Sequence, residues 1–209
     1  MKKEKFNTFS VPLGLLDYIN PIFYTITIIT IINNINLVNS YKIIMIIGSI
    51  ISILFGFIIP TGKVIVGLGI IKFKMPVSLV FLVNLGILLS GLMLFKYIMN
   101  IHYVLLLIIS LLIFSFLFLI YKKSSKVNTI AVLTGAFGYL LIYISLILLS
   151  IKTKNIIPTL CYLLAIILFL MLCGIGIKSN LKDPKVHWKI EISNVICQGL
   201  VALGTIVLF

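Results

Sequence analysis

KVHWKIEISNVICQGLVALGTIVLF, residues 185–209, is a helix-length stretch in which polar residues run into an apolar segment. Its polar residues recur at i, i+4, i+7 and i+11, and on a helix this spacing makes one stripe. The segment is long enough to cross a bilayer. Polar side chains within a bilayer face other helices or water rather than lipid. The stretch therefore predicts a transmembrane helix with one inward polar face, formed by His187, Glu191, Asn194 and Gln198.

The composition of the whole chain points to a membrane protein. Of the 209 residues, 62% are hydrophobic and only 10% are charged, and the mean hydropathy is +1.30. Soluble domains average about 25% charged residues. The apolar residues also come in blocks of roughly 18–22, the length that crosses a bilayer core. We therefore expect an all-α, polytopic helical membrane protein that forms a single membrane domain over residues 1–209.

The apolar blocks predict about seven transmembrane spans. The first block is interrupted by Asp17, Asn20 and Pro21. The segment 61–76 is ambiguous because its apolar core is too short to cross. Three placements of this segment stay open. It could extend the second helix, lie at the membrane interface, or bend back at its glycines. The expected spans are 12–32, 43–60, 77–99, 103–121, 130–151, 156–177 and 192–209.

The lysines predict the orientation. The formal net charge is +13, and all 17 basic residues are lysines. They lie mostly in short segments between apolar blocks, a pattern typical of topology signals and of contact with anionic lipid headgroups, so we expect no nucleic-acid partner. With seven spans, the positive-inside rule predicts an N-in, C-out, multi-pass protein of the cell inner or plasma membrane. Only four lysines then fall outside, namely Lys42, Lys96, Lys152 and Lys154.

Two short matches hint at an internal repeat. FKMPVS (73–78) resembles WKIEIS (188–193), and each follows a related glycine pair, in GLGIIK (67–72) and GIGIK (174–178). They fit a 3+1+3 plan of parallel repeats joined by the fourth span. Seven-helix sugar and vitamin transporters are built on such a plan. The chain has no Pro-Gln pair and no paired tryptophans, so the similarity is one of topology.

Polar residues other than lysine concentrate in the odd-numbered spans. Several lie at matching depth, about six to nine residues or roughly 9–14 Å from the expected cytoplasmic face. A depth-matched set predicts a polar pocket between spans 1, 3, 5 and 7. Its mostly neutral lining favours a polar uncharged or cationic small solute. The candidate substrate-binding residues are Asp17, Asn20, Asn84, Tyr139, Glu191, Asn194 and Gln198.

Simpler interpretations of these residues stay open. Amides also join transmembrane helices by hydrogen bonds. Glu191 is close enough in sequence to pair at the interface with Lys185 or Lys189 while their aliphatic stems snorkel. His187 and Glu191 would supply only two ligands of a metal site, and a catalytic zinc usually has three protein ligands. The three cysteines form no CxxC motif. We therefore expect no metal site and no cofactor.

Three functions remain compatible with this pattern. A small-solute transporter or permease would use the polar pocket. A membrane-embedded enzyme acting on a lipid-linked substrate at the cytoplasmic face would use His187, Glu191 and Asp183 as acid–base groups. A non-catalytic subunit would form a homo- or hetero-oligomer through an apolar flank. No catalytic motif of a known type is present in the sequence, so transport is the function that the polar stripes favour.

Overall fold

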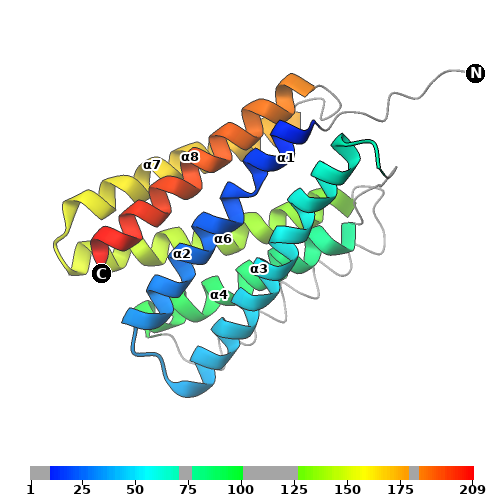
Figure 1. Ribbon diagram of the computed structural model, residues 1–209. Helices are drawn as coiled ribbons and strands as arrows, with labels where there is room; N and C mark the ends of the chain where they lie inside the picture. Colours follow the sequence, from blue (N-terminus) through cyan, green and yellow to red (C-terminus); the bar gives the residue numbers. More distant parts are fainter. Residues whose placement is uncertain (1–9, 71–76, 101–126, 179–183) are drawn as a thin grey trace, which may run out of the picture.

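The computed structural model describes residues 10–70, 77–100, 127–178 and 184–209, and the regular elements in these ranges are all α-helices (Figure 1). The predicted span 103–121 lies outside the described residues. The helices are α1 (Val11–Asp17), α2 (Ile19–Asn34), α3 (Asn39–Gly67), α4 (Val77–Met99), α6 (Val127–Lys152), α7 (Ile156–Lys178) and α8 (Pro184–Leu208).

Six helical stretches of the described chain are long and apolar enough to cross a membrane, with α1 and α2 counted as one. They coincide with six of the predicted spans. Their outward faces carry large apolar side chains, as on α7, where Ile156 is 72% and Met171 60% exposed. Such surfaces suit lipid rather than water. The protein is therefore a polytopic helical membrane protein, as its composition predicts.

The first span is broken between α1 and α2 at Tyr18. Pro21 has no amide proton, so the carbonyl of Asp17 loses the helical donor that it would have at that position. The backbone amide of Tyr18 instead bonds the carbonyl of Leu15, one residue closer than in an α-helix. The interruption that the sequence indicated is thus a break that places Asp17 at a helix end.

The second span is longer than predicted. The predicted span ends at residue 60, whereas α3 continues to Gly67. The reason is packing, because α1 lies directly against the added turns. A Cβ atom on Gly14 would come within 2.7 Å of Val64, and one on Gly67 within 2.8 Å of the backbone of Val11. Residues 61–67 therefore extend the second helix, the first of the three placements left open.

The last helix begins earlier than predicted. The expected span started at residue 192, but α8 starts at Pro184, a residue suited to the first turn of a helix. Glu191 therefore lies two turns inside the helix instead of at its start. Its side chain faces inward, while Ile192 and Ile196 face outward. This places a carboxylate within the helix bundle.

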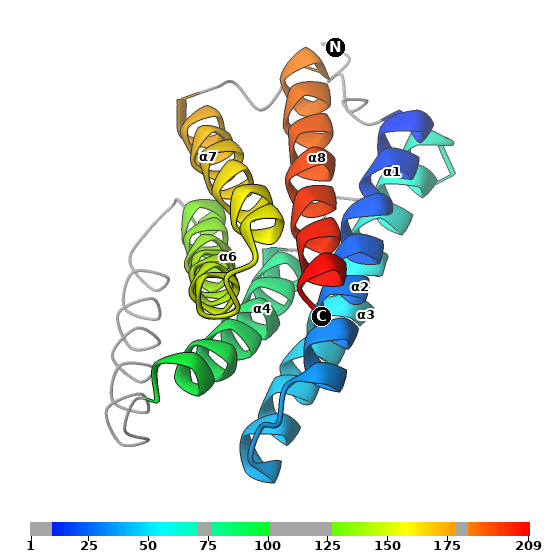
Figure 2. The same cartoon turned by 90° about the vertical axis from the view of Figure 1, so that its left-hand side faces the viewer.

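The described helices form a ring in which each packs on the next described helix. Helix α3 packs on α4, α4 on α6, α6 on α7 and α7 on α8, and α2 closes the ring against α8. Figure 2 shows α8 between the α6–α7 side and the α1–α3 side. Aromatic rings from three helices meet at the centre. Tyr139 of α6 lies 6.3 Å from Tyr24 of α2 and 5.8 Å from Phe169 of α7, centroid to centroid.

Candidate functional site

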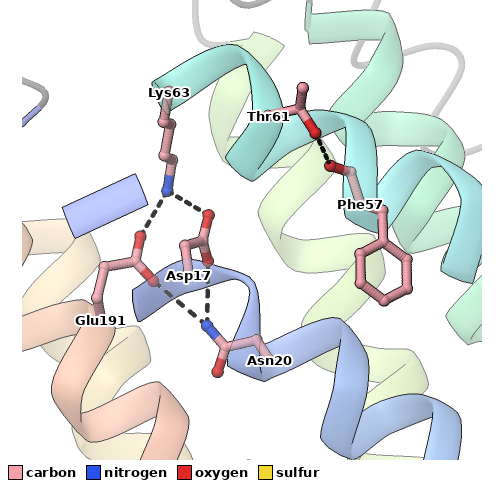
Figure 3. Close-up of polar contacts among 6 residues, drawn as sticks. All are labelled: Asp17, Asn20, Phe57, Thr61, Lys63 and Glu191. Atoms are coloured by element: carbon pink, nitrogen blue, oxygen red, sulfur yellow. Dashed lines mark hydrogen bonds and ion pairs between the residues drawn. The ribbon is translucent and has the colours of Figure 1, made fainter. Parts of the chain in front are cut away.

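Four polar side chains from three spans meet near the end of the bundle where α1 and α8 begin and α3 ends (Figure 1). The Lys63 ammonium lies 2.7 Å from Asp17 Oδ2 and 2.6 Å from Glu191 Oε1. The Asn20 amide nitrogen donates to Asp17 Oδ1 at 3.1 Å and to Glu191 Oε2 at 3.4 Å (Figure 3). Asp17, Asn20, Lys63 and Glu191 are called the charged cluster below.

The break in the first span positions the acidic side of the cluster. Asp17 is the last residue of α1, and Asn20 lies in the first turn of α2. Tyr18, at the break itself, shares a hydrogen bond of 2.6 Å with the hydroxyl of Thr61 on α3. The Tyr18 ring also lies 6.2 Å from that of Phe57. These contacts hold the break against α3, one turn from Lys63.

The cluster contains more acid than base, and it is buried. Two carboxylates share one ammonium, and the side chains of Lys63, Asp17 and Glu191 are 13%, 12% and 9% exposed. A charged side chain at the centre of a bilayer costs about 2.5–3.5 kcal/mol on insertion scales. Pairing and hydrogen bonds offset that cost only when each charge has a partner. The three side chains therefore depend on one another.

Of the predicted site residues, the structure brings Asp17, Asn20 and Glu191 together. Gln198 lies deeper along the same face of α8 and is 2% exposed. Its amide nitrogen donates to the Tyr143 hydroxyl at 3.2 Å. Tyr139 joins the central aromatic group next to Tyr143. Gln198 and Tyr139 therefore line the bundle interior beyond the charged cluster.

The two remaining predicted residues lie apart from the cluster. Asn84 is half-buried on α4, and its amide packs so closely on Gly135 of α6 that a Cβ atom there would overlap it. The Asn84 side chain thus occupies the contact between α4 and α6. Asn194 is half-buried on α8, and its side chain makes no hydrogen bond within the described part of the chain.

Lys63 is the residue that the sequence analysis missed. It was counted among the loop lysines that set the orientation, whereas it lies inside α3 and is paired with two acids. Glu191 was considered as a partner of Lys185 or Lys189 on its own helix, but its ammonium partner comes from another span. One signal was present in the sequence. The apolar run 64–68 directly after Lys63 indicates that a helix continues past it.

A group of hydroxyls lies between α3 and α4. The Ser49 and Ser90 hydroxyls share a hydrogen bond of 3.1 Å between α3 and α4. The Ser52 hydroxyl reaches the Val83 carbonyl at 3.2 Å. The helices approach closely here because Gly48 and Gly86 face each other. Polar groups therefore line the interface between α3 and α4.

Comparison with family models, with curated proteins and with solved structures finds no match to this chain. Function is therefore argued from the site alone. Among the described residues, no group of three or more His, Cys, Asp and Glu side chains is placed to hold a metal ion. The site consists of an ion-pair network that links three spans. Polar and aromatic side chains lie deeper in the bundle.

Proposed function

We propose that this protein is a small-solute transporter in which the charged cluster closes one end of the pathway. The observation that carries the proposal is the pairing of Lys63 with both Asp17 and Glu191. These three residues belong to three different spans. Ionisable residues inside a membrane are expensive to insert and typically mark solute or ion pathways.

An ion-pair network suits a closure that must open. Buried ion pairs contribute little net stability, because the desolvation of the charges offsets their attraction. The same groups can therefore separate and find water without a large loss of free energy. Opening would move α1 and α8 away from the end of α3. A broken first helix favours such a movement, because discontinuous helices are common in transporters.

The interior beyond the cluster supplies the pathway. Gln198, Tyr143 and Tyr139 follow the cluster along the inner faces of α8 and α6. Gln198 lies seven residues beyond Glu191, about 10 Å along the helix axis. Opening the cluster would connect this interior to the aqueous phase at that end. With the N-terminus in the cytoplasm, as the lysines predict, that phase is the cytoplasm.

The ring order of the helices fits the repeat in this proposal. A two-fold rotation that exchanges spans 1–3 with spans 5–7 would exchange the contact of α4 with α6 for that of α8 with α2. Both contacts are present. Parallel repeats of this kind rock against each other in several transporters. The repeat remains part of the proposal, and a superposition of the two halves would test it.

Accessibility from both sides tests the function. The protein, with Cys161, Cys173 and Cys197 replaced, carries Gln198→Cys and is reconstituted into vesicles. A charged, membrane-impermeant methanethiosulfonate is then applied from either side in separate reactions. A transporter exposes the same position to each side in turn, so labelling is expected from both. Ile196→Cys, on the outward face, is the matched control and should stay unlabelled.

A second arm of this experiment tests the closure. Adding Lys63→Met, Asp17→Asn and Glu191→Gln together to the Gln198→Cys protein removes the ion pairs without leaving an unpaired buried charge. These replacements should speed labelling from the side of the cluster and leave the rate from the other side unchanged. Protection of Gln198→Cys from both sides would contradict transport. It would favour the alternative that the protein is a non-catalytic membrane subunit.

A further inference from the structure

Two buried polar atoms on neighbouring turns of α2 have no hydrogen-bond partner in the described part of the chain. They are the side-chain oxygen of Asn20 and the hydroxyl of Tyr24. The residues are 9% and 5% exposed. At spacing i, i+4 they share one face of the helix. A buried polar group without a partner costs free energy that water or a ligand would recover, and in a bilayer no lipid tail can do so.

The orientation of the Asn20 amide is determined by its neighbours. Its nitrogen donates to the carboxylates of Asp17 and Glu191, whose oxygens accept but cannot donate. The opposite orientation would place an oxygen against two carboxylates. Figure 3 shows the Asn20 oxygen pointing away from both. The unpartnered atom is therefore an acceptor, and it needs a ligand that donates.

The surroundings of the Tyr24 hydroxyl are also rich in acceptors. The hydroxyls of Ser49, Ser52 and Ser90 lie near it, but none of them forms a hydrogen bond with it. Those serines donate to carbonyls one turn earlier on their own helices, at 2.7, 2.9 and 3.0 Å. Their protons are therefore already used in hydrogen bonds, and their oxygen lone pairs remain as acceptors near the Tyr24 hydroxyl.

Charge and aromatic rings narrow the class of ligand. Asp17 and Glu191 share the single ammonium of Lys63, so the charged cluster, which includes Asn20, carries a formal charge of −1 when its groups are ionised. The ring of Tyr139 stands edge-on to Tyr24, and the ring of Phe169 lies next to Tyr139. Aromatic faces attract organic cations. A negative cluster, two unpartnered oxygens and aromatic rings together favour a cation that donates hydrogen bonds.

We infer that Asn20 and Tyr24 form the binding site for a small protonated amine. Its N–H groups donate to the Asn20 oxygen and the Tyr24 hydroxyl, and its charge balances the cluster. This inference deepens the proposed transport function by naming a class of solute. Asn20 belongs to the charged cluster, and Tyr24 lies one turn deeper into the bundle, about 6 Å further along the axis of α2.

Methylammonium is the probe, because it is small, cationic and carries N–H donors. The full chain is placed in lipid nanodiscs, and its thermal unfolding midpoint is followed as methylammonium is added at constant ionic strength. A saturable rise of the midpoint is expected, because a ligand that binds only the folded protein stabilises it. Tetramethylammonium, which has no N–H group, and Na⁺ should leave the midpoint unchanged.

Variants locate the site. Tyr24→Phe removes one hydrogen bond and should weaken methylammonium binding about tenfold. Asn20→Leu should abolish the response. Thr25→Val is the control, since the Thr25 hydroxyl bonds the Pro21 carbonyl on its own helix, and this variant should respond like the unaltered protein. If Asn20→Leu does not fold, Tyr24→Phe still decides the question.

Several results would overturn the site. They are no saturable response to methylammonium, an equal response to tetramethylammonium or Na⁺, and unchanged binding in Tyr24→Phe. The labelling of Gln198→Cys from both sides tests transport separately. Two-sided labelling without methylammonium binding would reject the amine and keep transport. Methylammonium binding without two-sided labelling would keep the site and reject transport.

Discussion

The Lys63 ammonium on α3 lies 2.6 Å from the Glu191 carboxylate on α8, although 128 residues separate them in sequence. The same ammonium lies 2.7 Å from Asp17 at the break in the first span. One cation thus holds three helices together at one end of the bundle.

Lys63→Met should strongly destabilise the protein. It leaves Asp17 and Glu191 buried side by side without their ammonium partner. Removing one partner of a buried ion pair typically costs about 3–5 kcal/mol. Chemical unfolding in detergent micelles measures the change in the free energy of unfolding. Lys189→Met removes an exposed lysine and is the matched control. Equal stability of the two variants would mean that the charges are not paired in the folded protein.

Removing all three charges should restore most of that loss. The triple variant Lys63→Met, Asp17→Asn and Glu191→Gln keeps the approximate side-chain volumes and leaves no unpaired charge. Neutral replacement of a whole buried ionic group is often neutral or stabilising. The same unfolding measurement applies. A triple variant as unstable as Lys63→Met alone would show that the lysine acts through packing of its stem rather than through its charge.

Gly86→Ala should loosen the contact between α3 and α4. A Cβ atom there would overlap the Gly48 carbonyl and the Ser52 hydroxyl, and it would lie 2.9 Å from the Ser52 backbone nitrogen. Overpacking of this kind costs about 1–3 kcal/mol. At Gly56 the nearest atom is Pro21 Cβ at 3.4 Å, so Gly56→Ala has room. It should gain about 1 kcal/mol from helix propensity. The midpoint of thermal unfolding should therefore fall in Gly86→Ala and rise in Gly56→Ala.

Gln198 and Tyr143 should behave as a coupled pair. Their hydrogen bond of 3.2 Å joins α8 to α6. A double-mutant cycle with Gln198→Leu and Tyr143→Phe should give a coupling of about 0.6 kcal/mol, the average for hydrogen bonds between transmembrane helices. Asn194→Leu should change stability by less than about 0.5 kcal/mol, since that amide has no partner among the described residues. If the stability changes of Gln198→Leu and Tyr143→Phe are simply additive, the two side chains are not hydrogen-bonded.

The orientation can be checked with two single cysteines in a cysteine-free background. Lys185→Cys lies near the start of α8, and Thr153→Cys lies in the connection between α6 and α7. Both positions are exposed. With the N-terminus in the cytoplasm, an impermeant thiol reagent added to intact cells should label Thr153→Cys and spare Lys185→Cys. The reverse pattern would invert the predicted orientation.

The predicted inward and outward faces of α8 were readable from the sequence. The apolar composition determines that the helices lie in a membrane, and a period of 3.6 residues determines which side chains share a face. Of the polar stripe, Glu191 and Gln198 are buried and His187 and Asn194 are half-buried, whereas Ile196 on another face is exposed. These properties depend on residues close together in the chain, so no knowledge of packing is needed.

The partners of those side chains were decided only by the tertiary structure. Glu191 has lysines nearby on its own helix, yet it pairs with Lys63, which looked like a loop residue. The pairing requires α3 to continue to Gly67, and that extension is packed against α1 through the close approach of Gly14 to Val64. A contact between residues 128 positions apart depends on where each helix ends and on which helices are neighbours. The period and composition of one segment determine neither of these properties.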